Sequence, residues 1–161
     1  MIDDGVLFAT MTTPTAEVAS GDVLADTQQL FLESRGTDPN AMPRNSGSLI
    51  LVNAQVIDKG DQAPALDIVV LRSNVSLGTE NSAPDISDAN AVEVLKVINI
   101  EAGDYNDMGA WQLAEKVQIA TVLQGDVDAK TLYVGLIARE TYTPGAASNL
   151  VVRLGVMREA P

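Results

Sequence analysis

The sequence predicts an all-β fold, an antiparallel jelly roll or a related β-sandwich, with about eight strands and one short helix near residues 88–94. Three observations predict this class. Several short segments alternate apolar and polar side chains, as strands with one buried face do. Turns rich in Gly, Pro and Asp separate these segments. Hydrophobic residues make up 46% of the 161 residues but aromatic residues only 4%, which predicts a core of aliphatic side chains.

The alternation places the strands along most of the chain. In order, the expected strands are 7–12, 28–32, 49–57, 65–72, 94–100, 116–123, 131–139 and 149–157. In the strand 49–57, the even positions from Ile50 to Val56 form the apolar face. Its other face is mixed, because Leu49, Leu51 and Ile57 share it with Asn53 and Gln55. We expect this mixed face to be buried against a partner.

Turn and cap residues divide these strands. The segments 35–47, 58–64 and 141–148 contain Gly, Pro, Asp and Asn and are expected as loops. Ser87 is suited to cap the short helix and Asp88 to its first turn. No repeat and no boundary divides the chain, so one domain is expected over 14–161, preceded by an N-terminal arm over 1–13.

Composition excludes several classes of function. The net charge is −12, with only ten Lys and Arg, which argues against nucleic acids and anionic membranes as partners. The chain has no Cys and no His, so a Ser-His-Asp or Cys-His nucleophile and a thiolate or imidazole metal site are impossible. The N-terminus is acidic where a signal peptide would be basic. We therefore expect a protein that stays in the cytoplasm unless a larger object carries it out.

The acidic residues form no recognisable catalytic or metal-binding motif. Asp3 and Asp4, Asp85 and Asp88, and Asp126 and Asp128 are the close pairs, and each lies in a turn-like segment where Asp commonly bonds the backbone. The segments 103–109 and 125–130 lack the frame of an EF-hand loop. No Gly-rich phosphate loop is present. The sequence predicts a protein that is not an enzyme and has no catalytic residue, metal or cofactor.

Apolar residues outside the strong strands are the candidate contacts with another protein. They are Ile2, Leu7 and Phe8 of the arm, and Tyr105, Met108 and Trp111 of a Gly- and Asp-containing loop. Trp is enriched at the centres of interfaces. The alternative is that Trp111, the only Trp, closes one end of the sandwich, and the sequence leaves both interpretations open.

Three segments carry a resemblance to a known family. They are V-I-D-K-G-D-Q-A-P-A-L-D from Val56, D-I-S-D-A from Asp85, and A-S-N-L-V-V-R-L-G from Ala147. From 56 to 158 the sequence is similar to small virion proteins of tailed bacteriophages, some of which are head decoration, or cement, proteins with jelly-roll folds. The residues before Val56 depart from the resemblance, and the family offers no catalytic residue to carry over.

The resemblance implies a decoration protein on the outer capsid surface, made in the host cytoplasm. Its partners would be the major capsid protein and further copies of itself, as a trimer rather than a dimer. Two other functions remain open. One is a different structural role in the virion, in the tail or neck, which copy number would separate from decoration. The other is a jelly-roll carbohydrate-binding or hydrolase domain, which the scarcity of aromatic residues disfavours.

Overall fold

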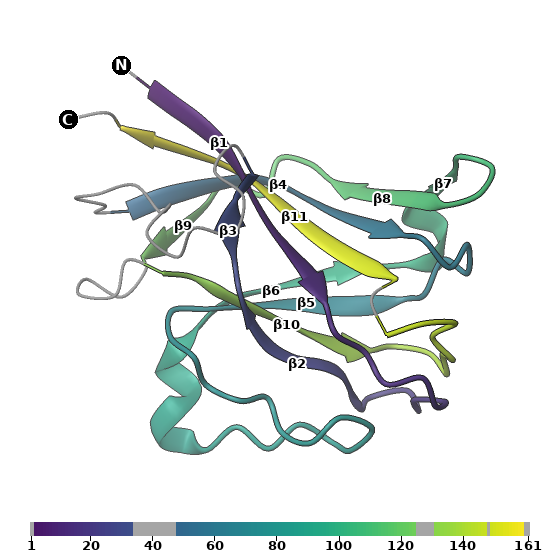
Figure 1. Ribbon diagram of the computed structural model, residues 1–161. Helices are drawn as coiled ribbons and strands as arrows, with labels where there is room; N and C mark the ends of the chain where they lie inside the picture. The colour runs from purple at the N-terminus through teal and green to yellow at the C-terminus, as the bar shows by residue number, and fades with distance from the viewer. Residues whose placement is uncertain (1, 34–47, 125–130, 148, 160–161) are drawn as a thin grey trace.

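Two antiparallel sheets face each other across an aliphatic core, which confirms the predicted all-β sandwich (Figure 1). The computed structural model describes residues 2–33, 48–124, 131–147 and 149–159, without the side chains of 2–4, 48, 158 and 159. The large sheet has the strand order β3 (Phe31–Leu32), β1 (Ile2–Met11), β11 (Leu150–Glu159), β4 (Ser48–Asp58), β8 (Gln112–Lys116), β7 (Tyr105–Asp107), and β9 (Thr121–Gln124) also pairs with β4. The small sheet has the order β2 (Val23–Gln29), β10 (Tyr133–Ala138), β5 (Leu66–Leu71), β6 (Val94–Ile100).

The described residues form eleven strands, against about eight expected. The additional strands include β3 and β7, which are only two and three residues long, too short to show an alternation. The expected helix is present as a 3-10 helix, η2 (Asp88–Glu93), preceded by Ser87. A second 3-10 turn, η3 (Ala102–Asp104), leads from the small sheet to the large one. The expected loop 35–47 lies outside the described residues.

The expected N-terminal arm is instead a strand inside the large sheet. β1 pairs with β11 from Ile2 opposite Glu159 to Met11 opposite Leu150. Leu7 and Met11 are fully buried in the core between the sheets. A free arm over 1–13 is therefore wrong for residues 2–11, because their backbone pairs with β11 and because Leu7, Ala9 and Met11 are buried in the core.

A bulge in β4 reverses one of the predicted faces. Gly155 of β11 lies opposite Asn53, but the next residue, Val156, lies opposite Leu51, so Val52 is the extra residue. A one-residue shift exchanges the two faces of a strand. Leu51 consequently points into the core, while Ile50, expected inside, is 45% exposed.

The expected strand 116–123 is two strands, β8 and β9, with a kink between them. Gln118 and Ala120 have φ angles of 59° and 47°, in the left-handed region that non-glycine residues rarely adopt. The amide of Ile119 donates to the carbonyl of Val52 at 3.1 Å, so the kink is attached at the β4 bulge. Val117, next to the kink, is 61% exposed, although alternation over a continuous strand 116–123 would place it on the same face as the buried Leu123.

The outer side of the small sheet is covered by the chain between β5 and β6 (Figure 1). A second apolar cluster lies there, separate from the main core: Val23, Val69, Leu71, Leu77 and Ile137. Leu77 fits over Gly135, where an added Cβ would lie 2.5 Å from Leu77 Cδ1. The inner strands of the small sheet are thus buried on both faces, whereas Val97 on the outer side of the edge strand β6 is 48% exposed. No helix in the described part of the chain is long and apolar enough to span a membrane.

Candidate protein-binding surface

Of the six predicted contact residues, Leu7 lies inside the core, and Tyr105 is half-buried against it. Leu7 is fully buried in the main core, since it lies on the inward face of β1. Tyr105 packs against the same core, and its hydroxyl donates to the carbonyl of Pro64 at 3.0 Å. Burial raises the pKa of Tyr105, with nearby Asp58 adding to the effect. Ile2 belongs to β1, but its side chain lies outside the described residues.

The other three predicted residues reach the surface at two separate places. Phe8 is half-buried on the outward face of β1, with its ring centroid 6.4 Å from that of Phe31. Met108 is 52% exposed in the turn between β7 and β8, where its amide donates to the carbonyl of Trp111. Trp111 is half-buried and belongs to neither apolar cluster, so it does not close the sandwich. The two places lie toward opposite edges of the large sheet.

The outer face of the large sheet carries its side chains in rows across the strands, as antiparallel pairing requires. One apolar row joins Val151, Ile57 and Leu113. A second apolar row joins Met157, Ile50 and Val122. Ile50 and Val122 are 45% and 60% exposed. In the first row Val151 is only 9% exposed, while Ile57 and Leu113 are half-buried. This face therefore carries two apolar rows that are partly open to the solvent.

A polar row lies between the two apolar rows and is joined by hydrogen bonds. Arg153 forms an ion pair with Glu33, with 2.7 Å between Nη2 and Oε2. Its Nη1 donates to Oε1 of Gln55 at 3.2 Å. Gln55 in turn donates from Nε2 to Oε1 of Glu115 at 3.0 Å. The row thus links the end of β3 with β11, β4 and β8.

Asn53 anchors the row to the backbone at the β4 bulge. Its Nδ2 donates to Oε1 of Glu115 at 3.4 Å, and its Oδ1 accepts from the amide of Gly155 at 3.0 Å. Gly155 leaves the space for this, since an added Cβ would lie 2.1 Å from Asn53 Oδ1. One carboxylate oxygen of Glu115 is therefore held by two amides, and no described residue donates a hydrogen bond to the other oxygen, Oε2.

The two sheets differ in how their outer faces are covered. On the small sheet, the outward residues Val69, Leu71 and Ile137 are buried under the chain between β5 and β6. On the large sheet, the outward residues Phe8, Ile57 and Met157 remain half-buried, and Ile50 is exposed. An apolar face that is left open in this way is typical of a contact with another protein.

An open depression of about 930 Å3 lies beside β2. Its lining includes Asp26, Ser76, Glu80 and Asp85. The Asp26 carboxylate accepts from the Ser76 hydroxyl at 2.9 Å and from the amide of Leu77 at 2.7 Å, so it holds the neighbouring segment. Among the described residues, no group of three or more acidic side chains is placed to hold a metal ion. The depression is best explained as part of the fold.

The predicted mixed face of 49–57 pointed to this surface, but of its five residues only Asn53, Gln55 and Ile57 lie on it. Ile50, which was expected on the opposite face, lies there too. Arg153 was missed, although it stands on the outward side of a clear alternation between Val151 and Gly155. No protein-family model matches the sequence, and no curated protein matches it significantly.

Proposed function

We propose that this protein is a head decoration protein that binds the assembled major capsid lattice of a tailed bacteriophage through the outer face of its large sheet. The observation that carries the proposal is this uncovered face, with two apolar rows on either side of an ordered polar row. The resemblance of 56–158 to small virion proteins supports the choice of partner.

Such a role needs a rigid scaffold more than a reaction. A protein that binds the assembled lattice and not the free subunits stabilises the lattice by its binding free energy, repeated over many copies. Two sheets closed over one core provide a rigid face, and a net charge of −12 favours a partner with basic groups. Self-association, as a trimer rather than a dimer, is part of the proposal.

A matched pair of substitutions tests the proposal. Ile50 and Val97 are 45% and 48% exposed, but Ile50 lies on the outer face of the large sheet and Val97 on β6 of the small sheet. Ile50→Asp and Val97→Asp therefore add the same charge at two strand positions whose side chains are similarly exposed. Binding to decoration-free shells of the phage that encodes the chain is measured by co-sedimentation.

We expect Ile50→Asp to weaken shell binding by about tenfold or more, because a carboxylate would be covered in the contact. Val97→Asp should bind as the unmodified protein does. Equal binding by all three proteins would show that another surface makes the contact. If the unmodified protein does not bind shells, the decoration role is wrong. The copy number of the protein in purified particles would then test a tail or neck role.

A further inference from the structure

Glu115 stands out among the charged residues of the outer face because its hydrogen bonds come from amides. The ion pairs within the described residues join Lys116 to Asp104, Arg139 to Asp67 and Arg153 to Glu33. Lys116 is next to Glu115 in sequence, but alternation in β8 turns it to the other face. The negative charge of Glu115 is thus not neutralised by a described cation.

The hydrogen bonds fix this carboxylate in one orientation. Gln55 and Asn53 both donate to Oε1, and each of these amides is itself held, by Arg153 and by the amide of Gly155. A side chain that is already ordered loses little conformational entropy when a partner binds. Oε2 remains open to a donor from outside the described chain.

The surroundings make a cation the matching donor. The apolar rows on either side would exclude water from a contact, and a charge pair is stronger where water is excluded. A partner that covered Glu115 without a cation would leave a desolvated charge without a counter-charge, which is costly. The net charge of −12 over the whole molecule also favours a partner with cationic groups.

We propose that Glu115 receives a lysine or arginine side chain from the capsid subunit, and that apolar side chains of that subunit flank this cation and cover the two apolar rows. The inference rests on the proposed function and names the chemistry of the partner surface. In this proposal the polar row orients the Glu115 carboxylate for binding to the partner.

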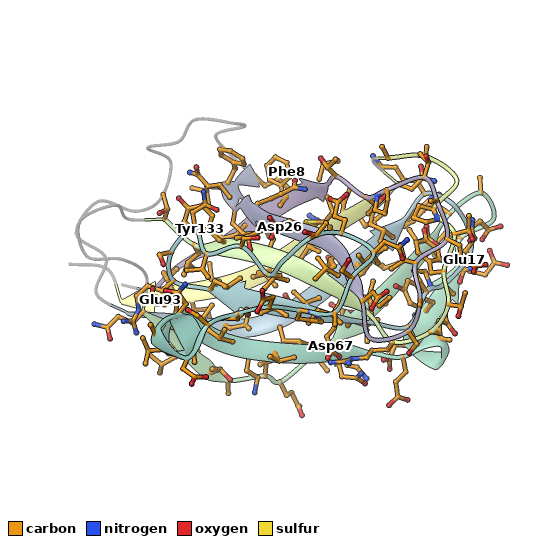
Figure 2. All side chains as sticks on the ribbon, turned by 90° about the horizontal axis from the view of Figure 1, so that it is seen from below. Phe8, Glu17, Asp26, Asp67, Glu93 and Tyr133 are labelled. Carbon is orange, nitrogen blue, oxygen red and sulfur yellow. The ribbon has the colours of Figure 1, made fainter. Side chains whose placement is uncertain are left out.

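The test compares Glu115→Gln with Glu17→Gln, which makes the same change at an exposed position between β1 and β2. Figure 2 shows Glu17 at one end of the molecule, outside the sheets. A glutamine at 115 keeps an oxygen that accepts from Gln55, removes the charge and replaces the accepting Oε2 with an NH2 donor. Shell binding is measured by co-sedimentation at low and at high salt, and the unfolding midpoint of each protein is measured separately.

We expect Glu115→Gln to bind shells about tenfold or more weakly and with a smaller dependence on salt, while Glu17→Gln binds as the unmodified protein does. Both unfolding midpoints should stay unchanged, because both positions are exposed. Equal binding by the two variants would overturn the inference and leave the decoration role standing. A lowered unfolding midpoint of Glu115→Gln with unchanged binding would show that the polar row only stabilises the sheet. If the unmodified protein does not bind shells, both proposals fall.

Discussion

The identity of Gly155 is explained by a side chain from the neighbouring strand. Asn53 lies over Gly155 and accepts its amide hydrogen, and this places the Asn53 amide beside Glu115. An added Cβ would lie 2.1 Å from Asn53 Oδ1, a distance that no packing tolerates. The glycine is needed here for close approach between two strands, not for an unusual backbone angle.

Gly155→Ala should therefore destabilise the fold by about 1–3 kcal/mol, because Asn53 must leave its place and break its hydrogen bonds. Gly103→Ala is the control, since nothing lies within 4 Å of a Cβ there, and we expect a change within about 0.5 kcal/mol. Urea denaturation of both variants measures the free energy of unfolding. Equal effects at 103 and 155 would contradict the role of Asn53.

Tyr142, which is buried, and Tyr105, which is half-buried against the core, differ in the partner of their hydroxyl group. Tyr105 donates to the carbonyl of Pro64, whereas the buried Tyr142 hydroxyl has no partner among the described residues. We expect Tyr105→Phe to lower stability by about 1 kcal/mol, while Tyr142→Phe should be neutral or stabilising, because a buried hydroxyl without a partner is unfavourable. Thermal unfolding of the two variants should rank them in this order, and a Tyr142→Phe that is the less stable of the two would contradict it.

Alkaline pH should destabilise the protein through the same two side chains. Burial raises the pKa of both tyrosines, and the charge of Asp58 adds to this. Above about pH 10 the unfolded tyrosines lose their protons while the folded ones keep them, so the unfolded state is favoured as the pH rises. The free energy of unfolding should begin to fall near pH 10, about the pKa of tyrosine in the unfolded chain, and should go on falling as the pH rises further. The fall should be smaller in Tyr142→Phe, and an identical pH dependence would contradict the burial of this hydroxyl.

At the scale of elements, the first strand supports both the fold and the candidate surface. β1 pairs with β11 along its whole length and places Leu7, Ala9 and Met11 in the core. Its outward face carries Phe8, beside the polar row. Removing β1 would uncover one side of β11, the strand that carries Arg153 and Gly155.

Deletion of residues 1–13 should therefore prevent folding, because it removes fully buried side chains together with a strand next to the middle of the sheet. Deletion of 1–3 is the control, since it removes only the register pairs with 158 and 159 and should leave a folded protein. Circular dichroism and the yield of soluble protein measure both variants. A folded, cooperative protein without residues 1–13 would show that this segment acts as an arm after all.

The sequence predicted the elements where the alternation is long and uninterrupted. The strands over 65–72, 131–139 and 149–157 and the short helix after Ser87 are close to β5, β10, β11 and η2. Asp3, Asp4 and Gly5 disfavour a strand locally, so the start of β1 could not be predicted. Its pairing comes from β11 at the far end of the chain, and no local pattern reports such a contact.

The candidate surface was only partly predictable for a similar reason. The bulge at Val52 depends on how β4 pairs with β11, and a single strand carries no signal of it. The sequence therefore placed Ile50 and Leu51 on the wrong faces. Glu115 and Arg153 are brought together by two different pairings with β4, and neither pairing can be derived from composition or spacing.

At the scale of the whole molecule, the two sheets give the protein two unlike sides. The outer face of the large sheet is open, while the chain between β5 and β6 covers the small sheet on the opposite side (Figure 1). If the large sheet faces the capsid, the covering segment faces away from it. The orientation of the protein on the shell therefore follows from the surface that binds.

An epitope inserted between Ala83 and Pro84 should test this orientation. Both residues are exposed in the covering segment. The backbone hydrogen bonds that join this segment to β2 are made by Asn81 and Ser82, not by Ala83 or Pro84. We expect the tagged protein to bind shells with unchanged affinity, and an antibody against the epitope to bind free and shell-bound protein equally. An antibody blocked by the shell, with the unfolding midpoint unchanged, would place the covering segment at the contact and exclude the large sheet as the docking face. The large sheet and the covering segment lie on opposite sides of one rigid core, so the shell cannot cover both, and the antibody result decides between them.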